Sequence, residues 1–269
     1  MTYKLVALDI DGTIRSSERG LSARTRRAIG EVISAGATVT VATGRMFHSA
    51  LDSTAGLDLT SPIVSFQGAH IAYPTTGEVL WHRPLTEELT RSALDALDGW
   101  GSEILASIGD DAYFNITSPW VEGYRERNQG RVHVVGDLTA LAWREPSRLV
   151  AVGSEDDVRR LEQRLKSVFE SRLHITRSLP TFCEILHPDA GKHKALEWLC
   201  GHLGIRQDET VAFGNGYNDV DMLRWSGLGV AIGGAVPEVL EVADLVAPPL
   251  EEDGAAQVLE DMLRGGVIG

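Results

Sequence analysis

Residues 4–13 constrain the fold of this chain more than any other stretch. Residues 5–8 form a short apolar run, of the kind that a buried strand of a parallel sheet shows. The run ends at two carboxylates, Asp9 and Asp11, and Gly12 then breaks the strand. Because ligands of open α/β sheets bind beyond the carboxyl ends of the strands, this stretch predicts an acidic site at such an edge.

The two carboxylates indicate a particular chemistry. Like charges this close need a shared proton or a cation, and Mg²⁺ is typically held by one or two carboxylates together with a substrate phosphate. We expect Asp9 to attack phosphorus and form an aspartyl-phosphate. We expect Asp11 to exchange protons with the leaving group and later with water. Asp-x-Asp alone is not specific, because it also occurs in metal-dependent glycosyltransferases and in ordinary loops.

Composition limits the partners. The 269 residues can bury a sizeable core and suffice for one large domain or two modest ones. The 25 lysines and arginines against 38 acidic residues give a net charge of −13, which argues against nucleic acid or an anionic membrane as a general partner. No apolar run approaches membrane-spanning length, and no signal peptide is expected. Two distant cysteines, Cys183 and Cys200, fit packed residues in a reducing cytoplasm.

A second strand and turn are expected to reach the same edge. A helix is predicted to begin after Ser22, and residues 37–42 then form a strand that ends at Thr43-Gly-Arg. A right-handed β-α-β crossover places the two strand ends side by side. Thr43 is therefore expected to hydrogen-bond a phosphoryl oxygen bound at Asp9, with Gly44 letting the backbone approach closely.

The last third of the chain adds a lysine and a second polar turn. Residues 191–194 open a helix, whose N-terminus is electropositive, so a lysine there needs an anion beside it. Lys192 and Lys194 are both candidates. A strand at residues 210–213 then runs into Gly-Asn-Gly-Tyr-Asn-Asp, which includes Asn215. A dinucleotide fingerprint fails here, because Asp219 stands where its third glycine should be.

The segment between these motifs has a different pattern of predicted helices and strands. From residue 83 to 188, helical stretches alternate with short strand candidates, and none of these ends in an acid cluster or a glycine-rich loop. We predict an α/β core formed by residues 1–82 and 189–269, interrupted by an inserted α+β domain at residues 83–188. The helices expected in the insert cover residues 86–97 and 155–170, and its strands cover residues 104–107, 112–116, 132–135, 149–152 and 181–186.

In their order and position, these motifs resemble those of the haloacid dehalogenase superfamily of phosphatases, Cof-type, with an α/β cap of the C2 type. The first motif of that family is a strand ending in Asp-x-Asp-Gly-Thr, and the second is a Ser or Thr such as Thr43. Alignment on the Ala-Leu that follows puts the family's lysine at Lys192, although His193 replaces the usual glycine. The fourth motif, Gly-Asp-x-x-Asn-Asp, matches with Asn215 in place of its first acid. After a third apolar run, Gln67-Gly-Ala is a near match to the family's Asn-Gly-Ala.

The resemblance implies a Rossmann-like core and roles for individual residues. The implied catalytic residues are Asp9, Asp11, Thr43 and Lys192. The implied phosphate-binding residues are Gly12, Gly44, Arg45 and Asn218, and the implied metal ligands are Asp9, Asp11, Asn215 and Asp219. Since Asn215 removes one negative charge but keeps an oxygen, we expect weaker Mg²⁺ binding rather than its loss.

The implied function is a cytoplasmic, Mg²⁺-dependent phosphatase of small phosphorylated metabolites, such as sugar phosphates. Its expected partner is a small phosphate ester, with no nucleic acid and no membrane, and a homo-oligomer is compatible with the sequence. Two alternatives stay open. The same first motif occurs in phosphomutases, so the protein could be one of these. It could also be a degenerate, phosphate-binding regulator, in which Asn215 is the change that impairs catalysis.

Overall fold

The computed structural model describes residues 2–16, 18–127 and 131–269, which form two compact units. The first comprises the chain up to Arg45, Ala50–Trp81 and Lys192–Gly269. The second comprises Met46–Ser49 and His82–Gly191. The domain boundaries expected from the sequence, at residues 82/83 and 188/189, stay a prediction.

The first unit is built on a five-stranded sheet with the order β16-β15-β14-β1-β4, in which all neighbours are parallel. Its strands are β1 (Leu5–Leu8), β4 (Thr38–Val41), β14 (Thr210–Gly214), β15 (Leu228–Gly233) and β16 (Leu245–Pro249). Leu8 is level with Val41 on one side and with Phe213 on the other. The polar turns that follow these three strands therefore lie at the same edge of the sheet.

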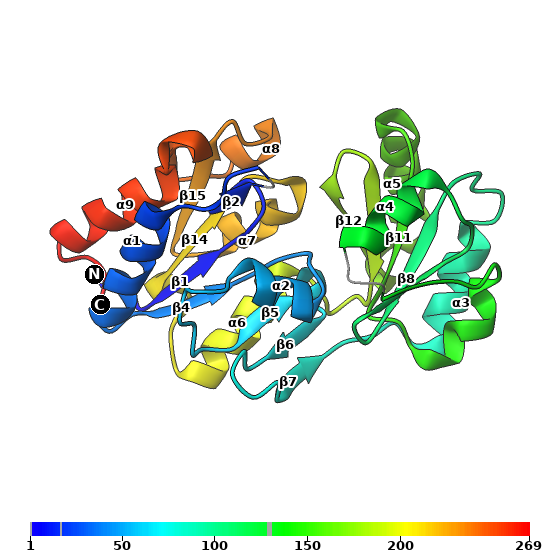
Figure 1. The fold of residues 1–269 in the computed structure, drawn as a ribbon, viewed down its shortest axis with the longest axis horizontal. Coiled ribbons are helices and arrows are strands. Elements are labelled where there is room, and N and C mark those ends of the chain that lie inside the picture. Colours follow the sequence, from blue (N-terminus) through cyan, green and yellow to red (C-terminus); the bar gives the residue numbers. More distant parts are fainter. Residues whose placement is uncertain (1, 17, 128–130) are drawn as a thin grey trace. The chain divides into compact units, whose positions relative to one another are not determined.

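Helices complete this unit. The first, α1 (Ala23–Ser34), begins after Ser22, whose hydroxyl accepts a hydrogen bond from the Thr25 amide, as the sequence predicted. It lies beside α9 (Gly254–Arg264), as Figure 1 shows, and Arg24 binds Glu260 through two hydrogen bonds of 2.9 and 2.6 Å. The helices α6 (Lys192–Leu203), α7 (Val220–Trp225) and α8 (Pro237–Leu240) share an apolar cluster with small residues of the sheet, namely Ala7, Ala212 and Ala231. Small residues in the strands let these helices pack close to the sheet.

Short elements surround the sheet. They are the hairpin β2 (Arg15–Ser16) and β3 (Gly20–Leu21), helix α2 (Phe47–Ser53), the small sheet β5 (Ile63–Ser65), β6 (His70–Ala72) and β7 (Val79–His82), and the 3₁₀ turns η1 (Phe66–Gly68), η4 (Gln207–Glu209), η5 (Tyr217–Asp219) and η6 (Leu250–Glu252). Of these turns, η1 begins directly after β5, and η5 begins after β14 with Asn215 and Gly216 between them. These two turns place predicted motifs in tight, fixed loops.

The second unit is built on a six-stranded mixed sheet with the order β10-β9-β8-β11-β13-β12, in which β10 and β9 are parallel and the other pairs antiparallel. Its strands are β8 (Ile104–Ile108), β9 (Asp111–Phe114), β10 (Val132–Val134), β11 (Arg148–Val152), β12 (His174–Leu179) and β13 (Phe182–Leu186). Alternate residues face opposite sides: Leu149 packs with α3 (Glu87–Ala96) and α5 (Glu155–Phe169), whereas Val150 packs against α4 (Pro119–Arg127). The 3₁₀ turns η2 (Leu138–Arg144) and η3 (Glu170–Arg172) complete the unit.

The predicted fold class, a parallel α/β core with an inserted α+β region, is confirmed. The expected strands and helices of the insert are present to within a few residues, but β12 and α4 were not predicted. Both cysteines are free and buried. Within the described ranges, no helix has the length and apolar character needed to cross a membrane.

Candidate active site

A buried lysine joins two carboxylates at the edge of the parallel sheet. The Lys192 ammonium lies 2.6 Å from an oxygen of Asp9 and 2.6 Å from an oxygen of Asp219. Asp9 follows β1, Lys192 begins α6, and Asp219 ends η5. All three side chains are almost wholly buried. The structure therefore brings residues from three of the sequence motifs into one charged cluster.

Burial and charge set the proton affinities in this cluster. Burial raises the pKa of Asp9 from 3.8 to about 7, and Asp219 adds to the rise while Lys192 opposes it. Burial alone would lower the pKa of Lys192, but the charges of Asp219 and Asp9 outweigh it, so the pKa of the lysine is raised. Lys192 thus stays protonated and is the positive charge that keeps Asp9 from a still higher pKa.

Asp219 organises the turn around it. Its second carboxylate oxygen accepts hydrogen bonds of 2.9 Å from the backbone amides of both Asn215 and Gly216. With Lys192 on the other oxygen, the carboxylate is bonded on both sides. Asp219 therefore holds the fourth-motif turn against the lysine.

Asn215 lies directly against the first motif. The Thr13 hydroxyl donates a 2.9 Å hydrogen bond to the Asn215 side-chain oxygen. A Cβ on Gly12, whose φ is +82°, would come within 2.4 Å of the Asn215 amide nitrogen, so glycine is required there. Thr13 was not among the predicted site residues, although its position directly after Asp-x-Asp-Gly could have indicated that it belongs to the site.

Asp11 and Arg45 form a forked ion pair. The guanidinium donates hydrogen bonds of 2.7 and 2.6 Å to the two carboxylate oxygens of Asp11. Arg45 was expected on the phosphate, and here it holds the predicted acid–base residue. The Thr43 hydroxyl accepts a 3.2 Å hydrogen bond from the Arg45 amide and is buried with the turn after β4.

A glutamine connects the second and fourth motifs. The Asn218 side-chain amide donates a 2.8 Å hydrogen bond to the side-chain oxygen of Gln67. The Gln67 nitrogen lies so close to Gly44 that a Cβ on this glycine would be 2.3 Å from it. The sequence marked Gln67 as a departure from a family pattern, but could not show these contacts.

Three further titratable residues are close in sequence to the cluster, namely His193, Lys194 and Asp221. Lys192 rather than Lys194 makes the contacts with the carboxylates. Asp221 pairs with Arg224 at 3.2 Å on the exposed side of α7. Burial lowers the pKa of His193, which keeps this imidazole neutral near pH 7.

The donors present suit a hard cation. Carboxylates of Asp9 and Asp11 and the amide oxygen of Asn215 come from turns at the same edge, and oxygen ligands are those that Mg²⁺ prefers. Within residues 2–16, 18–127 and 131–269 no three His, Cys, Asp or Glu side chains form a metal cluster. The oxygen donors present fit Mg²⁺.

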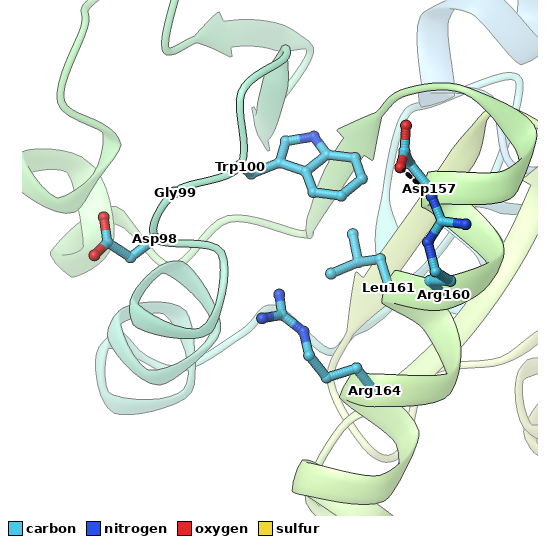
Figure 2. A pocket seen from close by; sticks show the side chains of 7 residues that line it. All are labelled: Asp98, Gly99, Trp100, Asp157, Arg160, Leu161 and Arg164. Atoms are coloured by element: carbon cyan, nitrogen blue, oxygen red, sulfur yellow. Dashed lines mark hydrogen bonds and ion pairs between the residues drawn. The ribbon is translucent and has the colours of Figure 1, made fainter.

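A pocket in the second unit is unrelated to these motifs. It has a volume of about 240 Å³ and lies between Trp100 and α5. Figure 2 shows Arg160 beside Asp157, to which it donates a 2.6 Å hydrogen bond, and Arg164 donates to the Ala96 carbonyl. Its two arginines therefore stabilise the helices that form the pocket.

The fold and this edge define a hydrolase class. Residues 6–259 match the family of haloacid dehalogenase-like hydrolases, and the chain belongs to that family. The family recognised from the motifs is thereby confirmed.

The similar proteins agree with that class. The chain is 27% identical to a 5-amino-6-(5-phospho-D-ribitylamino)uracil phosphatase of Bacillus subtilis, with 96% of each chain covered. It is 25% identical to an HMP-PP phosphatase of Serratia proteamaculans, covering 97% of this chain and 96% of the relative. A crystal structure of a haloacid dehalogenase-like hydrolase from Bacteroides thetaiotaomicron superimposes with a TM-score of 0.82 at 25% identity, over 97% of this chain and 100% of the other. The predicted enzyme class, a phosphatase of this superfamily, is confirmed.

Proposed function

We propose that this protein is a Mg²⁺-dependent phosphatase that hydrolyses small phosphorylated metabolites, sugar phosphates among them, through an aspartyl-phosphate on Asp9. The observation that carries the proposal is the buried contact of Lys192 with both Asp9 and Asp219 at the carboxyl edge of the sheet. A nucleophilic carboxylate must be ionised, and the doubly charged phosphate of the substrate must be able to approach it. The fixed positive charge of Lys192 favours both.

The chemistry follows from the side chains at the edge. An oxygen of Asp9 forms a bond to phosphorus as the bond from phosphorus to the ester oxygen breaks. Asp11 gives its proton to the departing oxygen, and then removes a proton from the water that hydrolyses the aspartyl-phosphate and restores Asp9. Because Arg45 holds both oxygens of Asp11 here, Asp11 has to leave this ion pair before it can act on the substrate.

The remaining groups bind and orient. Lys192 neutralises charge on Asp9 and on the phosphoryl group, and the Thr43 hydroxyl donates to a phosphoryl oxygen. We assign phosphate contacts to the backbone at Gly12 and Gly44 and to the side chains of Arg45 and Asn218. When bound, Mg²⁺ supplies a positive charge at the phosphoryl oxygens.

The metal would be held by Asp9, Asp11, Asn215 and Asp219. The Asp219 carboxylate also accepts bonds from Lys192 and from two backbone amides, so its main contribution to holding the metal would be its negative charge. The acid-to-amide change at Asn215 is also the observation that favours a phosphate-binding regulator as a second candidate function.

The substrate class is inferred from relatives and from charge. The two relatives named above act, by their names, on phosphorylated small molecules, which supports a metabolite rather than a macromolecule as the substrate. A net charge of −13 offers no broad basic surface for nucleic acid. Two free, buried cysteines support a reducing cytoplasm as the location.

A panel of phosphorylated metabolites, together with p-nitrophenyl phosphate, tests the proposal. We expect phosphate release from several members, abolished by EDTA and restored by Mg²⁺. Binding of inorganic phosphate without any release from the panel would favour the regulator. Transfer of phosphate within a sugar phosphate, without release, would favour a phosphomutase.

A further inference from the structure

The turn that follows β5 has an unusual backbone. Three successive residues lie in the left-handed region, with φ of 49° at Phe66, 57° at Gln67 and 93° at Gly68. Glycine tolerates this region, and asparagine enters it more readily than glutamine does. Strained positions of this kind persist only where the surroundings fix them, and they concentrate at functional sites.

Backbone hydrogen bonds hold this turn against the second motif. The Phe66 amide donates to the Arg45 carbonyl at 2.9 Å, and the Gln67 amide donates to the Thr43 carbonyl at 3.0 Å. These bonds run to the turn that carries the predicted phosphate-binding groups. The position of Gln67 is therefore tied to that of Thr43 and Arg45.

The Gln67 side chain then spans to the fourth motif. It is 1% exposed, accepts the Asn218 amide on its oxygen at 2.8 Å, and rests its nitrogen against Gly44. The hydrogen bond on its oxygen and the packing of its nitrogen against Gly44 hold its neighbours in one arrangement. The two turns that would contact a phosphate are thus joined by this side chain.

We infer that Gln67 is a positioning residue, which fixes Asn218 relative to the Thr43–Arg45 turn and so shapes the phosphate-binding site. The inference rests on the proposed function of that site. An asparagine at this position suits the left-handed backbone better but is one methylene shorter, so it cannot keep both contacts. The longer side chain of glutamine thus serves to reach both Asn218 and Gly44, and it does not stabilise the turn.

The variant Gln67→Asn separates the effect of backbone strain on stability from the effect of side-chain reach on phosphate binding. We expect the melting temperature to change little, because the relieved backbone strain offsets the lost hydrogen bond. We expect the dissociation constant for inorganic phosphate, measured by calorimetry, and the KM for p-nitrophenyl phosphate each to rise about five- to tenfold, the usual effect of losing one hydrogen bond. Gln257→Asn is the matched control: it shortens a glutamine of α9 whose side-chain amide donates to the Glu252 carbonyl of η6, and it should change none of these values.

A double-mutant cycle completes the test. If Gln67 acts through Asn218, then Gln67→Asn should have no further effect on phosphate binding in an Asn218→Ala background. Unchanged phosphate affinity in Gln67→Asn would overturn the inference, and so would a weaker affinity accompanied by a lower melting temperature, since that pattern belongs to a structural role. Wild-type protein that binds phosphate but releases none from any ester would remove the proposed function and leave the positioning result readable.

Discussion

The Lys192 ammonium and an Asp9 carboxylate oxygen lie 2.6 Å apart, although 183 positions separate the two residues in the chain. Both side chains are buried, and the Asp219 carboxylate lies on the other side of the lysine at the same distance. One cation between two acids leaves a net negative charge in a buried site. The first prediction follows from that imbalance.

Removing the lysine charge should destabilise the protein. Lys192→Met leaves Asp9 and Asp219 facing each other without a cation, and breaking a buried pair in this way typically costs about 3–5 kcal/mol. We expect a markedly lower melting temperature and no turnover. Lys194→Met, two residues along the same helix, is the control and should change the melting temperature little. Equal losses in the two variants would show that Lys194 shares the role. Adding Asp9→Asn to Lys192→Met should recover part of the stability.

The raised pKa of Asp9 makes the metal-free protein sensitive to pH. The folded state holds the Asp9 proton up to about pH 7, whereas the unfolded chain loses it near its ordinary pKa of 3.8. Between these values the folded state binds more protons, so the free energy of unfolding falls as the pH rises. In EDTA, the melting temperature of the wild type should therefore fall more steeply between about pH 4 and pH 7 than that of Asp9→Asn. Parallel curves for the two proteins would contradict the raised pKa.

Asn215→Asp should strengthen metal binding. The added charge lies beside Thr13 and Gly12, at the first-motif edge, and keeps an oxygen of the same reach. We expect a lower Mg²⁺ concentration for half-maximal activity, a smaller effect on turnover, and the same set of substrates. Because Asn215 precedes Gly216, a pairing prone to deamidation, mass spectrometry of this peptide must accompany the titration. An unchanged or higher Mg²⁺ concentration for half-maximal activity would mean that Asn215 is not a ligand.

The proposed domain boundaries can be tested by limited proteolysis. If residues 83–188 form a separate domain, the first cuts should fall near residues 82 and 188, where the chain passes between the two compact units. A bound phosphate analogue should slow cleavage at those points. First cuts inside β8 or β11, in the middle of the second sheet, would argue against this division.

Much of the fold could be read from the sequence because strong local patterns coincide with the elements. Residues 5–8 are wholly buried as β1, and Ser22 caps α1 as its position suggested. The two elements that were missed in the insert have weak patterns. In α4, Pro119 and Gly123 stand among charged residues, and β12 is an edge strand whose sequence, His-Ile-Thr-Arg-Ser-Leu, is mostly polar and does not alternate.

The site was predictable in its list of residues but not in its contacts. Strand ends and motif order predicted that Asp9, Lys192 and Asp219 would lie at the same edge, because parallel topology places them there. The pairing of Arg45 with Asp11, and of Gln67 with Asn218, depends on turn geometry and on side-chain orientation. No local pattern in a single sequence encodes a left-handed glutamine or a guanidinium that reaches across two turns.

The aspartyl-phosphate on Asp9 can be tested most directly by acid-quenching the enzyme during turnover and mapping its peptides by mass spectrometry. The account predicts one added phosphoryl group on the peptide that contains Asp9, and none in a folded Asp9→Asn protein, which should also lack measurable turnover because an amide is a far weaker nucleophile. Circular dichroism and melting curves would establish that the variant is folded. Turnover retained in Asp9→Asn, or a phosphoryl group found only on another residue, would contradict the account.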